Sequence, residues 1–140
     1  MKSFIRWMGN KQKHIRHFLP FIPSEYNIYI EPFLGSGSLF LHLAPEKWII
    51  NDLNKDLINS WIDVRDHPNQ VLNTMKNFID STKGLSKAQL LIHCRKTTDQ
   101  LNTMKSSPNK TGLILILKKL EFSSDIFKNN KYYFKGITNN

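Results

Sequence analysis

A glycine-rich turn between two apolar runs constrains the fold of this chain more than any other feature. Residues 28–34 read Ile-Tyr-Ile-Glu-Pro-Phe-Leu, and the Gly-Ser-Gly of residues 35–37 follows directly. Because glycine lacks a Cβ, such a turn lets a ligand approach the backbone closely. Residues 38–44 then predict a short helix, which Pro45 ends. The order is typical of a strand buried on both faces, a ligand-binding loop and a helix.

A second apolar run supports an α/β fold. Residues 47–51 predict another strand, and Asp52 follows it, 21 positions after Glu31. An acid about 20 residues beyond a glycine loop is where nucleotide-binding α/β folds contact ribose hydroxyls. We therefore expect Asp52 to accept hydrogen bonds from a ribose.

The glycine spacing limits the class of ligand that the loop is expected to bind. A dinucleotide loop reads Gly-x-Gly-x-x-Gly, but Phe40 occupies the third glycine position, and no Gly-Lys-Ser/Thr is present. The loop therefore favours a ligand without a pyrophosphate, such as S-adenosylmethionine. Taken alone, the pattern fits a plain tight turn equally well, since short glycine patterns often match by chance.

The basic head of the chain adds two candidate contacts. Trp7 offers a flat surface on which an adenine can stack, and Lys11 a point charge for a carboxylate. The plainer alternatives are a core tryptophan and a solvated lysine. After Gly9, the spacing of Ile15, Phe18 and Leu19 predicts a helix that Pro20 and Pro23 end.

Three blocks together resemble the opening motifs of the DNA adenine-N6 methyltransferases, in particular the DNA adenine methylase branch. They are Trp7-Met-Gly-Asn-Lys11, Glu31-Pro-Phe-Leu-Gly-Ser-Gly37 and Asn51-Asp-Leu-Asn54. The resemblance implies a partial Rossmann-like S-adenosylmethionine-dependent methyltransferase fold over residues 1–65. It also implies that the cofactor is bound by Trp7, Lys11, Glu31, Phe33, Gly35, Ser36, Gly37 and Asp52.

The same resemblance implies a helical target-recognition region over residues 66–140. Apolar spacing predicts helices over residues 54–64, 68–82, 87–105 and 111–122, and the tail holds one strand-like segment. The apolar face expected for the second of these helices is Val71, Leu72, Met75, Phe78 and Ile79, and Ser86 is the expected N-cap of the third. A net charge of +9 and a pI of about 9.7 favour a polyanionic partner, here double-stranded DNA. The expected DNA contacts are Lys118, Lys119, Lys128, Lys131, Tyr132, Tyr133 and Lys135; a solvated helix face and a hairpin core are the alternatives.

The catalytic signature of the family is missing from the sequence. That signature is Asp/Asn-Pro-Pro-Tyr/Phe, whereas all six prolines here are isolated. A doubly wound sheet also needs more strands than the two expected here. We therefore expect an N-terminal portion without catalytic residues, completed by a C-terminal companion chain. An inactive remnant that binds DNA or cofactor is the alternative, and a nucleotide-dependent oxidoreductase is a more distant one.

The remaining composition sets the expected surroundings. The single cysteine, Cys94, excludes an internal disulfide and fits a reducing compartment. The five histidines show no metal-ligand spacing, so no metal is expected. No stretch approaches the ~20 apolar residues of a membrane span. Together with this reducing compartment, the resemblance implies the cytoplasm of a bacterium, or of the host of a phage or virus, and a role in restriction-modification.

Overall fold

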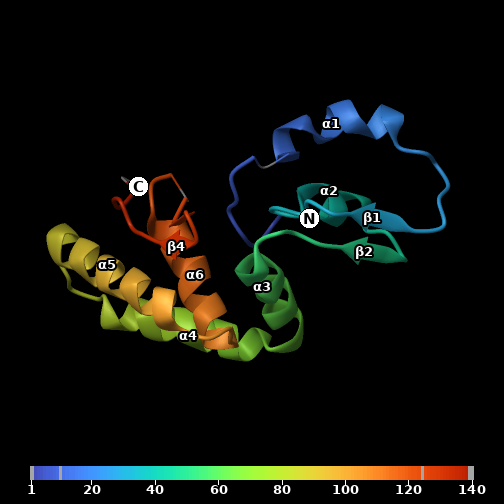
Figure 1. Cartoon of the computed structure of the whole chain (residues 1–140). Coiled ribbons are helices and arrows are strands. Elements are labelled where there is room, and N and C mark those ends of the chain that lie inside the picture. The colour runs from blue at the N-terminus through green and yellow to red at the C-terminus, as the bar shows by residue number, and fades with distance from the viewer. Residues whose placement is uncertain (1, 10, 124, 139–140) are drawn as a thin grey trace. The chain divides into compact units, whose positions relative to one another are not determined.

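The chain folds into two compact units, Met1–Ile58 and Asn59–Asn140, each of which is considered by itself. A computed structural model (Figure 1) describes residues 2–9, 11–123 and 125–138. The division falls within helix α3 (Lys55–Asp66). The first unit combines helices with a parallel sheet and the second is mostly helical, so the mixed α/β character predicted from the sequence is confirmed.

Two parallel strands form the sheet of the first unit. Strand β1 (Tyr29–Glu31) pairs with β2 (Trp48–Ile50), and helix α2 (Ser38–Leu43) lies between them in sequence. Parallel strands need such a crossover connection. The predicted strand over residues 28–34 is shorter, because Pro32 has no N–H to donate to a ladder. Ala44 caps α2 in the left-handed conformation.

The prediction of a strand buried on both faces is wrong. Ile30 is 60% exposed and its register partner Ile49 is 55% exposed. Both faces of a parallel sheet are buried only when crossover helices cover them. Among the described residues this sheet has two strands and one crossover helix, so its second face lies open.

The predicted N-terminal helix is present as three short pieces. They are the 3₁₀ helix η1 (Lys11–His14), α1 (Ile15–Phe18) and the 3₁₀ helix η2 (Leu19–Phe21). Pro20 lies in the first turn of η2 instead of ending the helix, a position where its missing N–H is not needed. Ile15 is the buried side chain of this segment.

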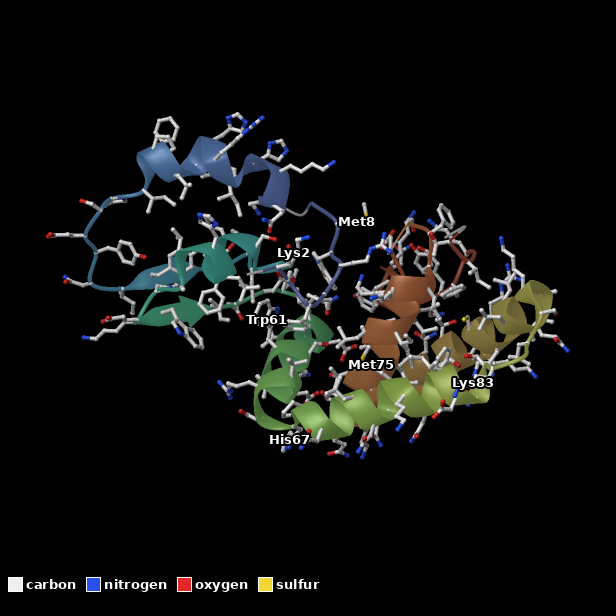
Figure 2. All side chains as sticks on the ribbon, turned by 180° about the vertical axis from the view of Figure 1, so that it is seen from behind. Lys2, Met8, Trp61, His67, Met75 and Lys83 are labelled. Carbon is white, nitrogen blue, oxygen red and sulfur yellow. The ribbon has the colours of Figure 1, made fainter. Side chains whose placement is uncertain are left out.

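Three complete helices follow the end of α3 in the second unit. They are α4 (Pro68–Ser81), α5 (Lys87–Thr103) and α6 (Pro108–Leu120), and α6 packs against both others (Figure 1). Figure 2 labels His67 at the start of α4, Met75 along it and Lys83 beyond its end. The predicted apolar face of α4 is confirmed at Val71 and Phe78, which are buried. It is wrong at Leu72 and Ile79, which are exposed.

A short hairpin follows α6. Strands β3 (Phe127–Lys128) and β4 (Lys131–Tyr132) are antiparallel, where the sequence indicated one strand. Asn129 and Asn130 connect them with φ of 52° and 59°. Two successive positive φ values are typical of a type I′ turn, in which asparagine is favoured. Tyr132 and Phe134 bury the base of this hairpin in the core of the second unit.

Candidate functional site

A pocket of about 230 Å³ lies beside the glycine turn of the first unit. It is lined by Trp7, Met8, Gly9, Lys11, Glu31, Phe33, Leu34, Gly35, Ser36, Ser38, Leu39 and Asp52. Seven of the eight residues predicted to bind a cofactor are in this set, and Gly37 is not. The structure therefore brings residues from three separate sequence blocks to one cavity.

The carboxylate of Asp52 joins the two loops that follow the strands. Its Oδ2 accepts a hydrogen bond from the Gly35 N–H at 2.9 Å, and its Oδ1 accepts from the Asn54 N–H at 3.0 Å. Each carboxylate oxygen has two lone-pair positions, so both oxygens retain acceptor capacity toward a ligand. Asp52 thus shapes the glycine turn and also presents acceptors to the pocket.

The turn itself depends on glycine at two positions. Gly35 has a φ of 54° and Gly37 a φ of 63°, both in the left-handed region. A Cβ on Gly35 would lie 3.4 Å from Cδ1 of Trp7, so the indole packs directly over the turn. Gly37 precedes α2 and donates its N–H to the Leu34 carbonyl at 2.8 Å. Its contribution is the shape of the turn, which explains why it does not line the pocket.

A second carboxylate, Glu31, lies in the same pocket in different surroundings. The Tyr29 hydroxyl donates to its Oε2 at 2.7 Å. Burial raises the pKa of Glu31 above its usual value, while the hydrogen bond from Tyr29 and the charge of Lys11 act in the opposite direction. The pKa of the Tyr29 phenol is raised by burial and by the hydrogen bond to Glu31. The pocket therefore combines two carboxylates, one ammonium and an indole.

Five lining residues were not predicted from the sequence. They are Met8, Gly9, Leu34, Ser38 and Leu39. Gly9 has a φ of 72° and directs the N-terminal segment around the pocket. Ser38 shares a hydrogen bond of 2.9 Å with Ser36, oxygen to oxygen. Each of the five lies within three positions of a predicted residue. Their position next to the motif residues is therefore the signal that could have found them.

Four of the predicted DNA contacts are exposed lysines in the second unit. Lys128 and Lys131 flank the hairpin turn, Lys119 lies on α6, and Lys135 lies in the tail. The Lys135 ammonium lies 5.1 Å from the centroid of the Tyr133 ring. The Tyr133 hydroxyl donates to Asp125 at 2.7 Å. Burial and this hydrogen bond raise its pKa to about 12.

Two predicted DNA contacts are corrected by their burial. Lys118 is 4% exposed and Tyr132 is 7% exposed. The Tyr132 ring belongs to the apolar core, and its backbone N–H donates to Asn102 at 2.6 Å. Lys118 lies on the inner face of α6 because the helix turns positions 114, 117 and 118 toward the core. Neither side chain is accessible to a phosphate.

Among residues 2–9, 11–123 and 125–138, no three His, Cys, Asp or Glu side chains gather as metal ligands. Cys94 is fully buried, and burial raises the pKa of its thiol to about 11. None of the described helices combines the length and apolar character that crossing a membrane requires.

Comparison with known proteins identifies the family to which these features belong. Residues 7–139 match the family model described as D12 class N6 adenine-specific DNA methyltransferase. A type II methyltransferase of Lactococcus lactis subsp. cremoris is 39% identical over 77 residues, which is 55% of this chain and 27% of that protein. A DNA adenine methylase of Haemophilus influenzae is 38% identical over 58 residues, or 41% of this chain and 20% of that protein.

A third relative aligns along nearly the whole chain. A type II methyltransferase of Methanocaldococcus jannaschii is 28% identical over 159 aligned residues, covering 95% of this chain and 55% of that protein. The chain thus spans about a quarter of the length of the first two relatives and about half of the third.

Proposed function

Because this chain belongs to the D12 class N6 adenine-specific DNA methyltransferase family, we propose that it is the cofactor-binding and DNA-recognition portion of a site-specific adenine-N6 DNA methyltransferase. The observation that carries the proposal is that Trp7, Lys11, Glu31, Gly35 and Asp52 line one pocket. The reaction moves a methyl group from S-adenosylmethionine to the N6 amino group of adenine, as in a type II restriction-modification methyltransferase.

The residues of the pocket fit S-adenosylmethionine. Gly35 has a φ of 54°, which side chains other than glycine rarely adopt, so the turn that borders the pocket beside the Trp7 indole requires a glycine there. Asp52 accepts from the ribose hydroxyls, and Trp7, with Phe33, contacts the adenine. Lys11 pairs with the carboxylate of the methionine part and Glu31 with its ammonium, as the charges of the donors require. Ser36 and Gly37 keep the turn in the shape that admits the ligand.

These residues position the cofactor but do not react with it. S-adenosylmethionine supplies an electrophilic methyl group, and holding it in one orientation lowers the entropic part of the barrier to transfer. A target adenine must leave the DNA stack before its N6 atom reaches such a methyl group. We assign no catalytic residue to the chain, since it contains no Asp-Pro-Pro-Tyr sequence.

The second unit is proposed to bind double-stranded DNA. The hairpin turn between Lys128 and Lys131 is exposed, and Lys119 and Lys135 add charge in the same unit. Lysines that neutralise phosphates make affinity dependent on salt. Tyr133 is included in the proposed contact region because the ammonium of Lys135 lies over its ring. Lys118 and Tyr132 are left out because both are buried.

The open face of the β1–β2 sheet supports a companion segment. Ile30 and Ile49 share this face and are more than half exposed. A companion chain that adds strands would cover them and complete a Rossmann-like sheet. In this proposal, residues 1–65 belong to the cofactor domain and residues 66–140 to the recognition region. The place of action is the cytoplasm of a bacterium, or of the host of a phage or virus.

Transfer of tritium from labelled S-adenosylmethionine to unmethylated DNA distinguishes a chain that methylates DNA by itself from a portion that lacks catalytic residues. We expect no incorporation by this chain alone, because no Asp-Pro-Pro-Tyr sequence is available to hold a flipped adenine. Incorporation by the purified chain would show that another group does this work. A chain that binds neither cofactor nor DNA would instead be a remnant that has lost both functions.

A further inference from the structure

The first 24 residues contain no acid to balance their cations. They contain five Lys or Arg side chains and two histidines, and the first carboxylate of the sequence is Glu25. One of the cations, Lys11, lines the pocket, where it faces the charge of Glu31. The others therefore form a local excess of positive charge in the first unit.

Part of this charge is displayed on one short helical segment. Lys13, His14, Arg16 and His17 are exposed, and we refer to them as the basic strip. Ile15 is 5% exposed and anchors the segment, while η1 packs against α2. The fold thus fixes the backbone and leaves the four side chains directed to solvent.

The spacing within the basic strip places like groups side by side. Lys13 and Arg16 are three positions apart, as are His14 and His17, whose ring centroids lie 6.2 Å apart. Arg16 donates from Nε to Nε2 of His17 at 3.3 Å. Lys13 makes no hydrogen bond or ion pair with another residue that the structure describes. Like charges at this spacing destabilise a helix, and an anionic ligand removes that penalty.

We propose that Lys13 and Arg16 of the basic strip bind backbone phosphates of DNA beside the cofactor pocket. The segment that carries them begins at Lys11, which lines that pocket, so phosphates bound there lie close to the methyl donor. The proposal rests on the proposed function and adds a DNA contact in the first unit to those of the hairpin. Contacts to phosphate position the duplex and carry no sequence information.

The salt dependence of DNA binding tests this contact. Fluorescence anisotropy of a labelled duplex about two helical turns long, titrated at salt from about 50 to 200 mM, gives the slope of log affinity against log salt. Lys13→Gln with Arg16→Gln is expected to reduce that slope by about 1.8, since each phosphate contact contributes about 0.9. Two duplexes of unrelated sequence are expected to give the same reduction.

Matched variants separate a phosphate contact from a change in net charge or folding. Lys76→Gln with Lys83→Gln also removes two exposed cations, in the second unit, where Lys83 pairs with Asp80 at 2.7 Å. This control is expected to leave the slope unchanged. Lys13→Arg with Arg16→Lys is expected to keep the parent slope because both charges remain.

Four results would overturn the inference. A parent-like slope in the glutamine variant, while Lys128→Gln with Lys131→Gln weakens binding, refutes the basic strip and leaves the proposed function intact. An equal reduction in the Lys76/Lys83 control assigns the effect to net charge. If Lys13→Gln with Arg16→Gln loses binding to phosphatidylserine vesicles but keeps the parent DNA slope, the basic strip binds a membrane surface instead of DNA. A parent chain that binds no DNA refutes both the strip and the DNA-binding part of the proposed function.

Discussion

At the residue scale, two carboxylates of one pocket differ in what surrounds them. Asp52 accepts from two backbone N–H groups, at 2.9 and 3.0 Å, and these bonds fix the orientation of its carboxylate. Glu31 accepts from a phenol and is partly desolvated, which raises its pKa. Asp52 therefore acts as a fixed acceptor. The charged form of Glu31 is destabilised by burial, and a cationic group of a ligand would stabilise it.

Replacing Glu31 by Gln is expected to have opposite effects on stability and binding. Because the folded-state pKa of Glu31 is raised, its contribution to stability is full at low pH and is lost as the pH rises through that pKa. At pH 7, Glu31→Gln should therefore raise the urea midpoint of the ligand-free chain. Affinity for S-adenosylmethionine should fall about tenfold, through loss of one charge-assisted hydrogen bond.

The pH dependence of the urea midpoint tests whether burial destabilises the charged form of Glu31. The advantage of Glu31→Gln in the urea midpoint should shrink as the pH falls through the raised pKa toward the ordinary value of 4.5. Glu25→Gln, at an exposed carboxylate outside the pocket, is the matched control. An advantage of Glu31→Gln that grows on acidification would contradict the desolvation of Glu31.

Cys94 gives a prediction about reactivity. The thiolate is the reactive form, and burial raises the pKa of this thiol to about 11, so the folded chain presents a neutral, inaccessible thiol at pH 8. Iodoacetamide should label Cys94 only after unfolding in urea, as followed by mass spectrometry. Rapid labelling without denaturant would show that the second unit opens readily.

The motif residues of the pocket could be predicted from the sequence because their chemistry is local. Glycines at a positive φ and an acid after a strand identify themselves by type and position, as at Gly35 and Asp52. Burial could not be predicted in the same way. Lys118 lies within an apolar helix, and the residues next to it in sequence do not show that its own side of the helix faces the core.

At the element scale, the start of α5 followed from its capping residue, but the start of α6 did not: the helix predicted from residue 111 begins at Pro108, after the N-cap Ser107. The exposure of side chains was not predictable in this way either. The predicted N-cap Ser86 forms a full capping box with Gln89. Exposure depends on partners from distant parts of the sequence, which explains why the predicted burial of the first strand failed at Ile30. The hairpin turn at Asn129 and Asn130 was also missed, because the expected Asn-Gly signal is absent and two asparagines take its place.

The contact between α4 and α6 depends on a glycine. A Cβ at Gly112 would lie 2.7 Å from Cβ of Thr74 and 2.8 Å from the Val71 carbonyl oxygen. Gly112→Ala should therefore destabilise the chain by about 1–3 kcal/mol, as overpacking of a core typically does. Chemical denaturation measures this change. Gly136→Ala, whose Cβ would meet Phe122 at 3.6 Å, is the control, and equal losses in the two variants would contradict the close packing.

The capping box of α5 gives a second prediction at this scale. The Ser86 Oγ accepts from the Gln89 N–H at 3.3 Å, and the Gln89 Oε1 accepts from the Ser86 N–H at 2.9 Å. Ser86→Ala should lower the free energy of unfolding by about 1 kcal/mol, whereas Ser86→Asp keeps an acceptor and should retain most of it. An alanine variant as stable as the aspartate variant would show that the cap contributes nothing.

At the scale of the whole molecule, the two compact units divide the proposed work. The pocket lies within Met1–Ile58, and the hairpin lies within Asn59–Asn140. S-adenosylmethionine should therefore slow amide hydrogen exchange in residues 29–54 and leave α5 and α6 unchanged, because a ligand stabilises what it contacts. Uniform protection of both units would show that they respond to the cofactor as one body.

The most direct measurement is calorimetric titration of the chain with S-adenosylmethionine. We expect saturable binding to one site by the parent and by Asp99→Ala, which removes an exposed carboxylate from α5. We expect binding to be lost in Asp52→Ala, because that change removes both the proposed ribose acceptor and the link to the Gly35 N–H. No heat from the parent chain, or equal affinity in Asp52→Ala, would contradict the assignment of this pocket to the cofactor.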